Sequence, residues 1–268
     1  MESSRHFVLR HVTLITRQVE RVLPFYRDTL GLVARRPDAR TLTLHASPTA
    51  PVLITFTEDP AARAPTGRVA GLFHLALLVP DRPALAAVLA RLLEYHQPIE
   101  GLSDHGVSEA IYLADPDGNG EEIYRDRPRA EWPVDGDKVA MVTRALDPRG
   151  LLREAPEPPP AAPLAQATLG HVHLSVTSLA AAEKFYTGRL GLALRQDNYP
   201  GARFLAADGY HHHVAVNTWG QPAPRGPDPA TGLAGFAAAT TRVDTIQTLS
   251  DPDGIRVTLE PLGAVGKG

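Results

Sequence analysis

The sequence predicts an α+β fold made of four related modules in the order ABAB. Short motifs return at a constant offset along the chain, which indicates an internal repeat. In each A module a short alternating strand is followed by helical spacing that ends on glycine, as at Gly31 and Gly191. The composition agrees, because 43% of the 268 residues are apolar and 21% are charged, which is typical of a globular protein with room for two domains.

The two A modules share their opening motifs. HVTL at 11–14 returns as HVHL at 171–174, and FY at 25–26 returns at 185–186, with an offset of 160 residues in both cases. We expect the FY aromatic side chains to be core contacts of their helices. Each A module therefore predicts a strand, a helix and then further strands.

The B modules repeat as well, but the second copy is shorter. GLFH at 71–74 matches GLAG at 232–235, and DPDG at 115–118 matches DPDG at 251–254. From Gly71 to Asp115 the numbering advances by 44, whereas from Gly232 to Asp251 it advances by 19. The fourth module is therefore predicted to lack its helix.

The helix of the second module has clear sequence signals. Asp81 is placed as the N-cap and Pro83 lies in the first turn, where the missing N–H costs nothing. The spacing predicts one apolar face, made of Leu85, Val88, Leu89, Leu92 and Leu93. We predict three segments from these patterns: modules one and two at 1–126, a Pro/Ala-rich linker at 127–167, and modules three and four at 168–268.

Charge and composition argue against several kinds of partner. Lys and Arg total 27 against 30 Asp and Glu, and without a long basic run we expect no nucleic-acid partner. Apolar stretches such as 71–80 reach about half of the ~20 residues that span a bilayer, so no membrane partner is expected. The opening residues 1–6 lack the apolar core of a signal peptide, which favours a cytoplasmic location. Without cysteine, any metal must be held by nitrogen and oxygen ligands.

The second module contains the residues that favour metal chemistry. His74 lies on its first strand, and Glu122 follows the turn at 115–120. Two imidazoles and one carboxylate on one face of an octahedral ion leave positions open for substrate and dioxygen. The third ligand is His11 if module two pairs with module one, or His171 if it pairs with module three. We favour His171, because the histidines at 211–213 lie on the same module.

The run from 104 to 122 resembles the active-site stretch of extradiol ring-cleaving dioxygenases. That resemblance implies that Glu122 is a metal ligand, that His105 is the acid/base and that Tyr112 contacts substrate. Most of the chain is similar to the catechol-2,3-dioxygenase-like branch of the glyoxalase, bleomycin-resistance and dioxygenase superfamily. The implied fold is the vicinal oxygen chelate fold, in which tandem βαβββ modules form two cupped mixed-sheet domains.

The expected activity is extradiol cleavage of a small aromatic diol by dioxygen, with Fe(II) at His74, Glu122 and His171, and with Mn(II) or another divalent metal as the alternative ion. A histidine that titrates near neutrality can remove and return the protons this reaction moves. In the strand predicted at 210–216, successive histidines alternate faces, and His212 is our further catalytic candidate. Alternatives are a glyoxalase-like isomerase or lyase, and a non-catalytic binder of small molecules. Sheet-edge pairing between chains is common in the superfamily, so a homo-oligomer is one candidate assembly, and the sequence leaves the oligomeric state open.

Overall fold

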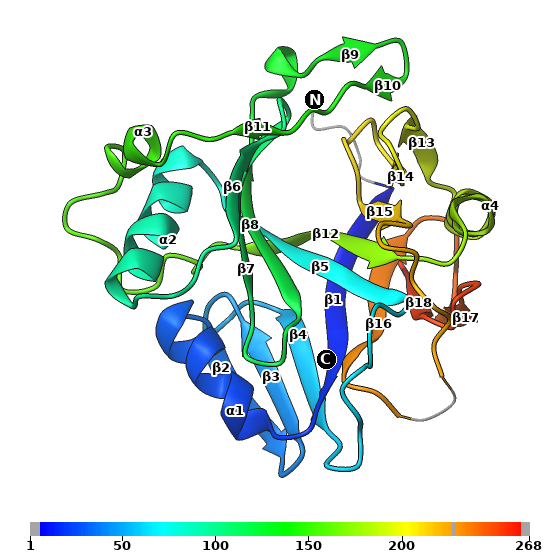
Figure 1. Cartoon of the computed structure of the whole chain (residues 1–268), viewed down its shortest axis with the longest axis horizontal. Helices are drawn as coiled ribbons and strands as arrows, with labels where there is room; N and C mark the ends of the chain where they lie inside the picture. Colours follow the sequence, from blue (N-terminus) through cyan, green and yellow to red (C-terminus); the bar gives the residue numbers. More distant parts are fainter. Residues whose placement is uncertain (1–5, 227–228, 264–268) are drawn as a thin grey trace.

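The computed structural model has the predicted α+β fold, built around two large mixed sheets (Figure 1). It describes residues 6–226 and 229–263, so most of the opening segment that we examined for a signal peptide lies outside the described residues. In the described part of the chain, every helix is too short or too polar to cross a bilayer.

One sheet has seven strands in the order β17-β18-β16-β1-β4-β3-β2. It is built from modules one and four. Its strands are β1 (Phe7–Thr16), β2 (Val33–Asp38), β3 (Thr41–His45), β4 (Val52–Glu58), β16 (Gly232–Thr240), β17 (Gln247–Ser250) and β18 (Arg256–Pro261).

The other sheet has nine strands in the order β11-β6-β7-β8-β5-β12-β15-β14-β13, and it is strongly curled (Figure 1). Modules two and three supply eight of them, and the linker supplies β11. The strands are β5 (Gly71–Leu78), β6 (Gly101–Asp104), β7 (Ser108–Ala114), β8 (Gly120–Asp126), β11 (Arg144–Ala145), β12 (Thr168–Ser175), β13 (Ala193–Gln196), β14 (Ala202–Ala206) and β15 (Val214–Asn217).

The helices agree with the repeat. They are α1 (Val19–Pro24), which continues as the π-helical turn η1 (Phe25–Thr29), then α2 (Arg82–Glu94), α4 (Leu179–Leu190), and the short η2 (Arg129–Glu131) and α3 (Pro148–Leu152). Asp81 caps α2 by accepting a hydrogen bond from the Ala84 N–H, as predicted. Leu93 is a correction, because it is 49% exposed and lies off the buried face. The described residues between β16 and β18 form β17 and no helix, as predicted.

The modules pair across the two halves of the chain. β5 pairs with β12 in antiparallel register, with His74 opposite His173, so module two joins module three. β1 pairs with β16 in the same way, so module one joins module four. The predicted segment boundaries at 126 and 168 stay a prediction, since each sheet draws on both halves.

The linker packs against the curled sheet. At one edge β11 pairs with β6. Toward the other edge, Gln196 on β13 accepts from the Met141 N–H and donates to the Met141 carbonyl, both at 3.1 Å. Just before these contacts in the sequence, β9 (Val134–Asp135) and β10 (Lys138–Val139) form a hairpin of the linker, which lies at the open side of the sheet (Figure 1). The linker thus forms part of whatever the curled sheet encloses.

Tyrosines of the repeated FY motif lie deep in the core. Tyr26 and Tyr186 are fully buried, and Phe25 is 4% exposed, as predicted. Tyr26 donates to both Asp115 and Glu121, and Tyr186 donates to Asp251. The FY helix of each half is therefore bonded to the DPDG turn of the same half, although the two belong to different sheets.

Candidate metal centre and its cavity

Three neighbouring strands place one ligand candidate each on the same face of the curled sheet. Glu122 lies on β8, His74 on β5 and His171 on β12, and these strands are adjacent in the order of the sheet. The Glu122 Oε2 atom is 2.9 Å from His74 Nε2 and 3.0 Å from His171 Nε2. All three side chains are buried, and their ligand atoms lie within 4.8 Å of one another.

These distances fit a single divalent ion. Two donors held about 2.1 Å from one ion and at right angles to each other lie about 3 Å apart. His74 Nε2 has no hydrogen-bond partner despite its closeness to Glu122, so the pair is not aligned as a hydrogen bond. Leaving a buried polar atom without a partner costs folding free energy, which indicates that this nitrogen binds a further group. The donor set of two nitrogens and one oxygen suits a divalent metal.

The charge states of Glu122 and His171 are those of metal ligands. Burial alone would raise the pKa of Glu122, but the adjacent His171 and His74 outweigh it and hold the pKa well below its usual range. Burial lowers the pKa of His171 to about 4, against the opposing pull of Glu122. At neutral pH the site therefore presents a carboxylate beside a neutral His171 imidazole, ready to coordinate without first losing a proton.

Glycine at the end of the turn allows this approach. A side chain at Gly120 would collide with the carbonyl group of Phe73, the residue before His74. β8 can therefore lie close against β5 only with glycine at position 120, which explains the glycine two residues before Glu122.

His11, the other candidate for third ligand, lies in the seven-stranded sheet. It is opposite Ala237 on β16, in the sheet where Gly235 and Thr258 stand at the positions that repeat His74 and Glu122. The ligand cluster found among the described residues contains His171 and not His11. The geometry thus follows the pairing of module two with module three that we favoured.

His105 and Tyr112 lie together beside this cluster. His105 Nδ1 is 2.7 Å from the Val142 carbonyl oxygen, which can only accept, so Nδ1 carries the proton. The other ring nitrogen, Nε2, is 2.8 Å from the Tyr112 hydroxyl. Burial, then the charge of Glu122, raises the pKa of Tyr112 well above its usual value, so the hydroxyl keeps its proton. In the neutral imidazole, Tyr112 donates to Nε2.

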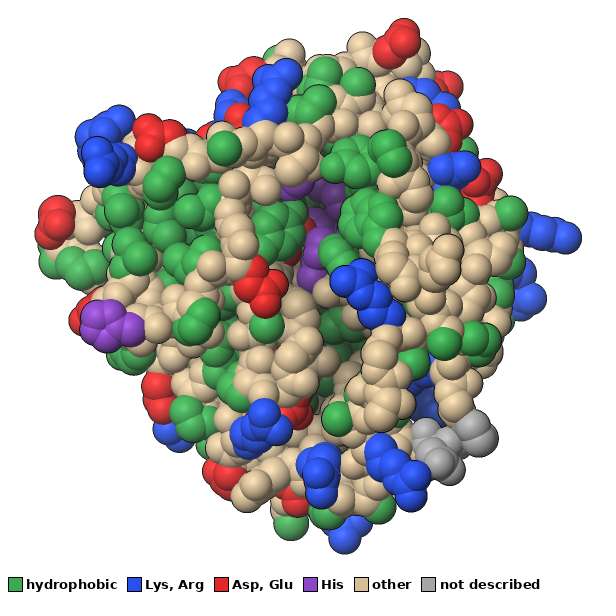
Figure 2. Space-filling view, in the orientation of Figure 1, with side chains coloured by type: hydrophobic (Ala, Val, Ile, Leu, Met, Phe, Trp, Pro, Cys, Tyr) green, Lys and Arg blue, Asp and Glu red, His purple; other side chains and the backbone are tan. Residues whose placement is uncertain are grey.

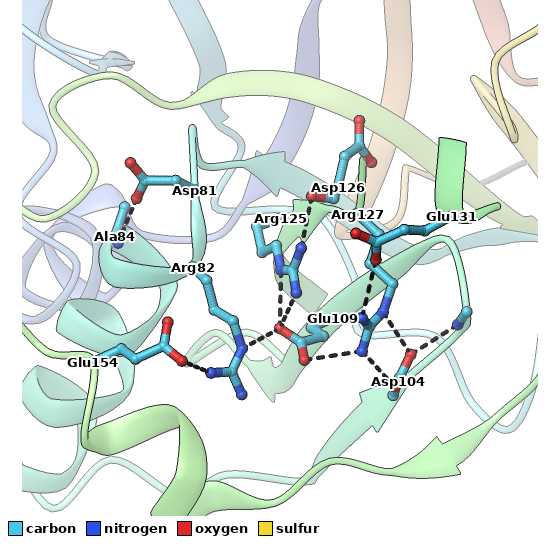
Figure 3. Close-up of polar contacts among 11 residues, drawn as sticks. Asp81, Arg82, Ala84, Asp104, Glu109, Arg125, Asp126, Arg127, Glu131 and Glu154 are labelled. Carbon is cyan, nitrogen blue, oxygen red and sulfur yellow. Dashed lines mark hydrogen bonds and ion pairs between the residues drawn. The ribbon is translucent and has the colours of Figure 1, made fainter. Parts of the chain in front are cut away.

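A charged network holds the turn that carries His105 (Figure 3). Arg127 contacts Asp104 at 2.7 Å and the buried Glu109 at 3.2 Å, and Asp104 also accepts from the Gly106 N–H at 2.8 Å. Arg125 and Arg82 bind the other oxygen of Glu109. The residues on both sides of His105 are therefore tied to β7 and β8, which positions the imidazole.

The three consecutive histidines have different environments. They precede β15, which begins at Val214, so the predicted strand at 210–216 is wrong in its first part. His212 faces the cavity of the cluster, whereas His213 lines a separate cavity on the other side. His211 lies between, with Nε2 at 2.9 Å from Asp126 Oδ1 and Nδ1 at 2.7 Å from His212 Nδ1.

This contact chain fixes the tautomer of His212. Because the Asp126 carboxylate accepts, His211 Nε2 carries a proton and, in the neutral ring, His211 Nδ1 is left as an acceptor. His212 Nδ1 then donates to His211, and His212 Nε2 keeps its lone pair. Burial also lowers the pKa of His212 well below its usual value, so the ring is neutral and its lone pair is on Nε2.

A cavity of about 260 Å³ lies over the ligand candidates. Figure 2 shows histidine side chains at the bottom of a hollow that hydrophobic side chains border. The cavity is lined by Phe73, His74, Ser103, His105, Tyr112, Glu122, Met141, Val142, Thr143, His173, Tyr199, Phe204, His212 and Trp219.

Several lining residues had no sequence signal. Met141, Val142 and Thr143 come from the linker, whose composition does not say where it docks. His173 and Phe204 lie on strands, but only the pairing of the modules shows which face they share with His74. The repeat did offer one clue, because HVHL has a histidine where HVTL has threonine.

Comparison with known proteins agrees with this architecture. The model of the Glyoxalase/Bleomycin resistance protein/Dioxygenase superfamily matches residues 8–123 and 168–252, and the interval between them contains the linker. A Bacillus subtilis (strain 168) protein named catechol-2,3-dioxygenase is 42% identical over 228 residues, which are 83% of this chain and 79% of that protein.

Solved structures share the fold at lower identity. A putative dioxygenase from Bacillus subtilis superposes with a TM-score of 0.61 and 15% identity, covering 96% of this chain and 86% of that one. Glyoxalase I from Zea mays superposes with a TM-score of 0.54 and 16% identity, covering 95% and 92%. With the family model matching most of its length, the chain belongs to the glyoxalase, bleomycin resistance protein and dioxygenase superfamily.

Proposed function

We propose that this protein is a metal-dependent extradiol dioxygenase that opens the ring of a catechol-like aromatic diol. The observation that carries the proposal is that the buried cluster of His74, Glu122 and His171 adjoins one cavity, which His74 and Glu122 line together with the hydrogen-bonded pair His105 and Tyr112. The relative named catechol-2,3-dioxygenase supports the substrate class.

Fe(II) is the ion we propose for this cluster, with Mn(II) as the substitute. His74, His171 and Glu122 would hold it, and their two nitrogens and one oxygen are the donor set of a facial triad with open positions. When bound, the ion would supply a Lewis acid for the two vicinal oxygens of the diol and a redox centre for dioxygen. Both atoms of dioxygen enter the ring-opened product, so the reaction needs no external reductant.

The chain's own residues move the protons. A catechol must lose protons as it chelates, and the lone pair we assign to His212 Nε2 is placed to accept one. His105 Nε2, which bears no proton in the neutral ring, takes up the other catechol proton and later returns it to the oxygen derived from the ring, while Nδ1–H stays anchored on Val142. Tyr112 bonds His105 and positions the diol through its hydroxyl.

Oxygen uptake tests the proposal. Purified protein reconstituted anaerobically with Fe(II) is mixed with catechol and methylcatechol in an oxygen electrode, and product is followed by its yellow absorbance. We expect stoichiometric loss of dioxygen and a yellow product. No uptake by protein shown to contain the ion would remove the proposal, and tight calorimetric binding without turnover would favour a binding protein instead.

A further inference from the structure

We propose that the protein acts on catechols whose ring substituents are uncharged, apolar or neutral, and that it discriminates against catechols with carboxylate side groups. This inference rests on the proposed function and names the substrate class of the same cavity. The observation behind it is the composition of the cavity's lining. Among the described residues that line the cavity, Glu122, a proposed metal ligand, is the only Asp, Glu, Lys or Arg.

The cavity's outer part is an aromatic wall made of Phe73, Tyr199, Phe204 and Trp219. These four rings form a continuous chain, with centroids 5.3 Å apart between Phe73 and Trp219, 6.1 Å between Trp219 and Tyr199, and 5.8 Å between Tyr199 and Phe204. Aromatic rings bury large apolar areas, and their faces are electrostatically negative. The aromatic wall therefore favours a flat apolar group and disfavours a carboxylate.

The imidazole behind this wall is also uncharged. The side-chain oxygen of Asn217 accepts from the backbone N–H of Trp219 at 3.1 Å, which identifies the other atom of the amide as the nitrogen. This nitrogen lies 3.0 Å from His173 Nε2 and donates to it. A ring nitrogen that accepts a hydrogen bond bears no proton, so His173 is neutral. It can offer a neutral donor to a substituent, but no positive charge.

The remaining polar groups of the lining are occupied or neutral. His105 is engaged through both ring nitrogens, with Val142 and with Tyr112. The Thr143 hydroxyl bonds the Tyr199 hydroxyl at 2.9 Å. A carboxylate brought into the cavity would thus lose its water without gaining an opposite charge, which is the costly case for a buried ion.

One guanidinium lies close by, outside the lining. Arg68 Nη1 is 3.5 Å from the carbonyl oxygen of Trp219, and the residue is exposed. Because it lies in solvent at the backbone side of the aromatic wall, its charge is screened and does not replace a buried partner. It is nevertheless the cation that a test must control.

The first test compares three catechols that differ only in the charge of a side chain of similar length: ethylcatechol, carboxymethylcatechol and aminoethylcatechol. Anaerobic calorimetry measures binding, and the oxygen electrode measures kcat/KM. We expect ethylcatechol to exceed carboxymethylcatechol by at least about tenfold in affinity and in kcat/KM, which is the effect of 1.4 kcal/mol, and aminoethylcatechol serves as the control for a charge of the opposite sign. Equal or better binding of carboxymethylcatechol overturns the inference.

This design separates the two proposals. If none of the three diols causes oxygen uptake, the proposed dioxygenase activity fails, and the calorimetric ranking still judges the cavity. If uptake occurs and the carboxylate is preferred, the activity stands and the uncharged substrate class is wrong. Loss of such a preference in Arg68→Gln would then identify the residue responsible.

A designed charge gives a second test. Ser103 lines the cavity on β6, and Ser103→Lys would place a cation there, while Ser103→Met adds similar length without charge. We expect Ser103→Lys to raise the ratio of carboxymethylcatechol to ethylcatechol binding at least about tenfold over Ser103→Met. An unchanged ratio in a variant that keeps its circular dichroism and metal content would contradict the inference.

Discussion

His171 and His11 occupy equivalent positions in the repeat, and their surroundings decide which of them can bind metal. His171 Nε2 lies 3.0 Å from Glu122, whereas His11 lies in the sheet whose equivalent positions are Gly235 and Thr258. A residue type at a repeated position therefore does not define a ligand. The side chains on the neighbouring strands do.

The two histidines make a matched pair for metal analysis. We expect His171→Ala to lose bound iron or manganese, because two donors hold a divalent ion far more weakly than three, and His11→Ala to retain it. Elemental analysis after reconstitution and desalting measures both. Retention by His171→Ala together with loss by His11→Ala would assign the third ligand to the other sheet.

The contact chain from Asp126 through His211 to His212 predicts a kinetic effect. Asp126→Asn weakens the charge-assisted bond that fixes the tautomers, so we expect kcat to fall about ten- to a hundredfold while the metal stays bound. Tyr210→Phe is the control, since it removes another hydrogen bond to the same carboxylate and leaves His211 in contact. A change in KM alone, or equal losses in the two variants, would argue against this role.

At the scale of the elements, the FY helix and the DPDG turn act as a pair. Tyr26 donates to Asp115 and Glu121 at 3.0 and 2.6 Å, and Tyr186 donates to Asp251 at 2.8 Å. Burial raises the pKa of Glu121 well above its usual value, and its second oxygen has no hydrogen-bond partner. The first copy of the pair therefore depends more heavily on its tyrosine.

Removing the two hydroxyls in turn measures this difference. We expect Tyr26→Phe to lower the free energy of unfolding by about 1–3 kcal/mol, because it leaves the buried Glu121 without its hydrogen-bond partner, although Asp115 keeps donors at Asp117 and Asn119. Tyr186→Phe should cost less, since Asp251 keeps two backbone donors, at Asp253 and Ile255. Urea unfolding followed by circular dichroism gives both values, and a larger loss in Tyr186→Phe would contradict this account.

The sequence predicts these elements well where a local signal exists. The Asp81 cap, the glycine at 191 and the short fourth module are confirmed, because each rests on chemistry within a few residues. The prediction that Leu93 belongs to the buried face of α2 is wrong, because helical spacing gives the direction of the apolar face but not its width. The position of the linker segment 141–143 could not be predicted, because it depends on a hydrogen bond to Gln196, which is far along the chain.

On the scale of the whole molecule, the decisive feature is that each sheet combines both halves. The candidate cluster takes His74 and Glu122 from the first half and His171 from the second. The sequence offered two pairings, and periodicity cannot choose between them, because strands of either module have the same alternation. The histidines near 211 tipped the choice through chemistry instead of pattern.

Splitting the chain tests this arrangement. The exposed segment 156–160 allows a cut that leaves every strand intact. We expect each fragment alone to lack cooperative unfolding and metal binding, because β1 and β5 each lose a sheet neighbour, and co-expressed fragments to recover both properties. A single fragment that melts cooperatively and binds the ion would show that one half is sufficient.

The strand order also constrains how the protein is made. When the first half leaves the ribosome, β5 has β8 beside it but waits for β12, and β1 has β4 but waits for β16. Two unsatisfied strand edges are thus presented by the nascent chain, that of β5 until β12 is made and that of β1 until β16 is made, and such edges are prone to aggregate with other chains. Biosynthesis of this protein consequently depends on delayed closure, and slowing synthesis after the linker should increase aggregation during expression.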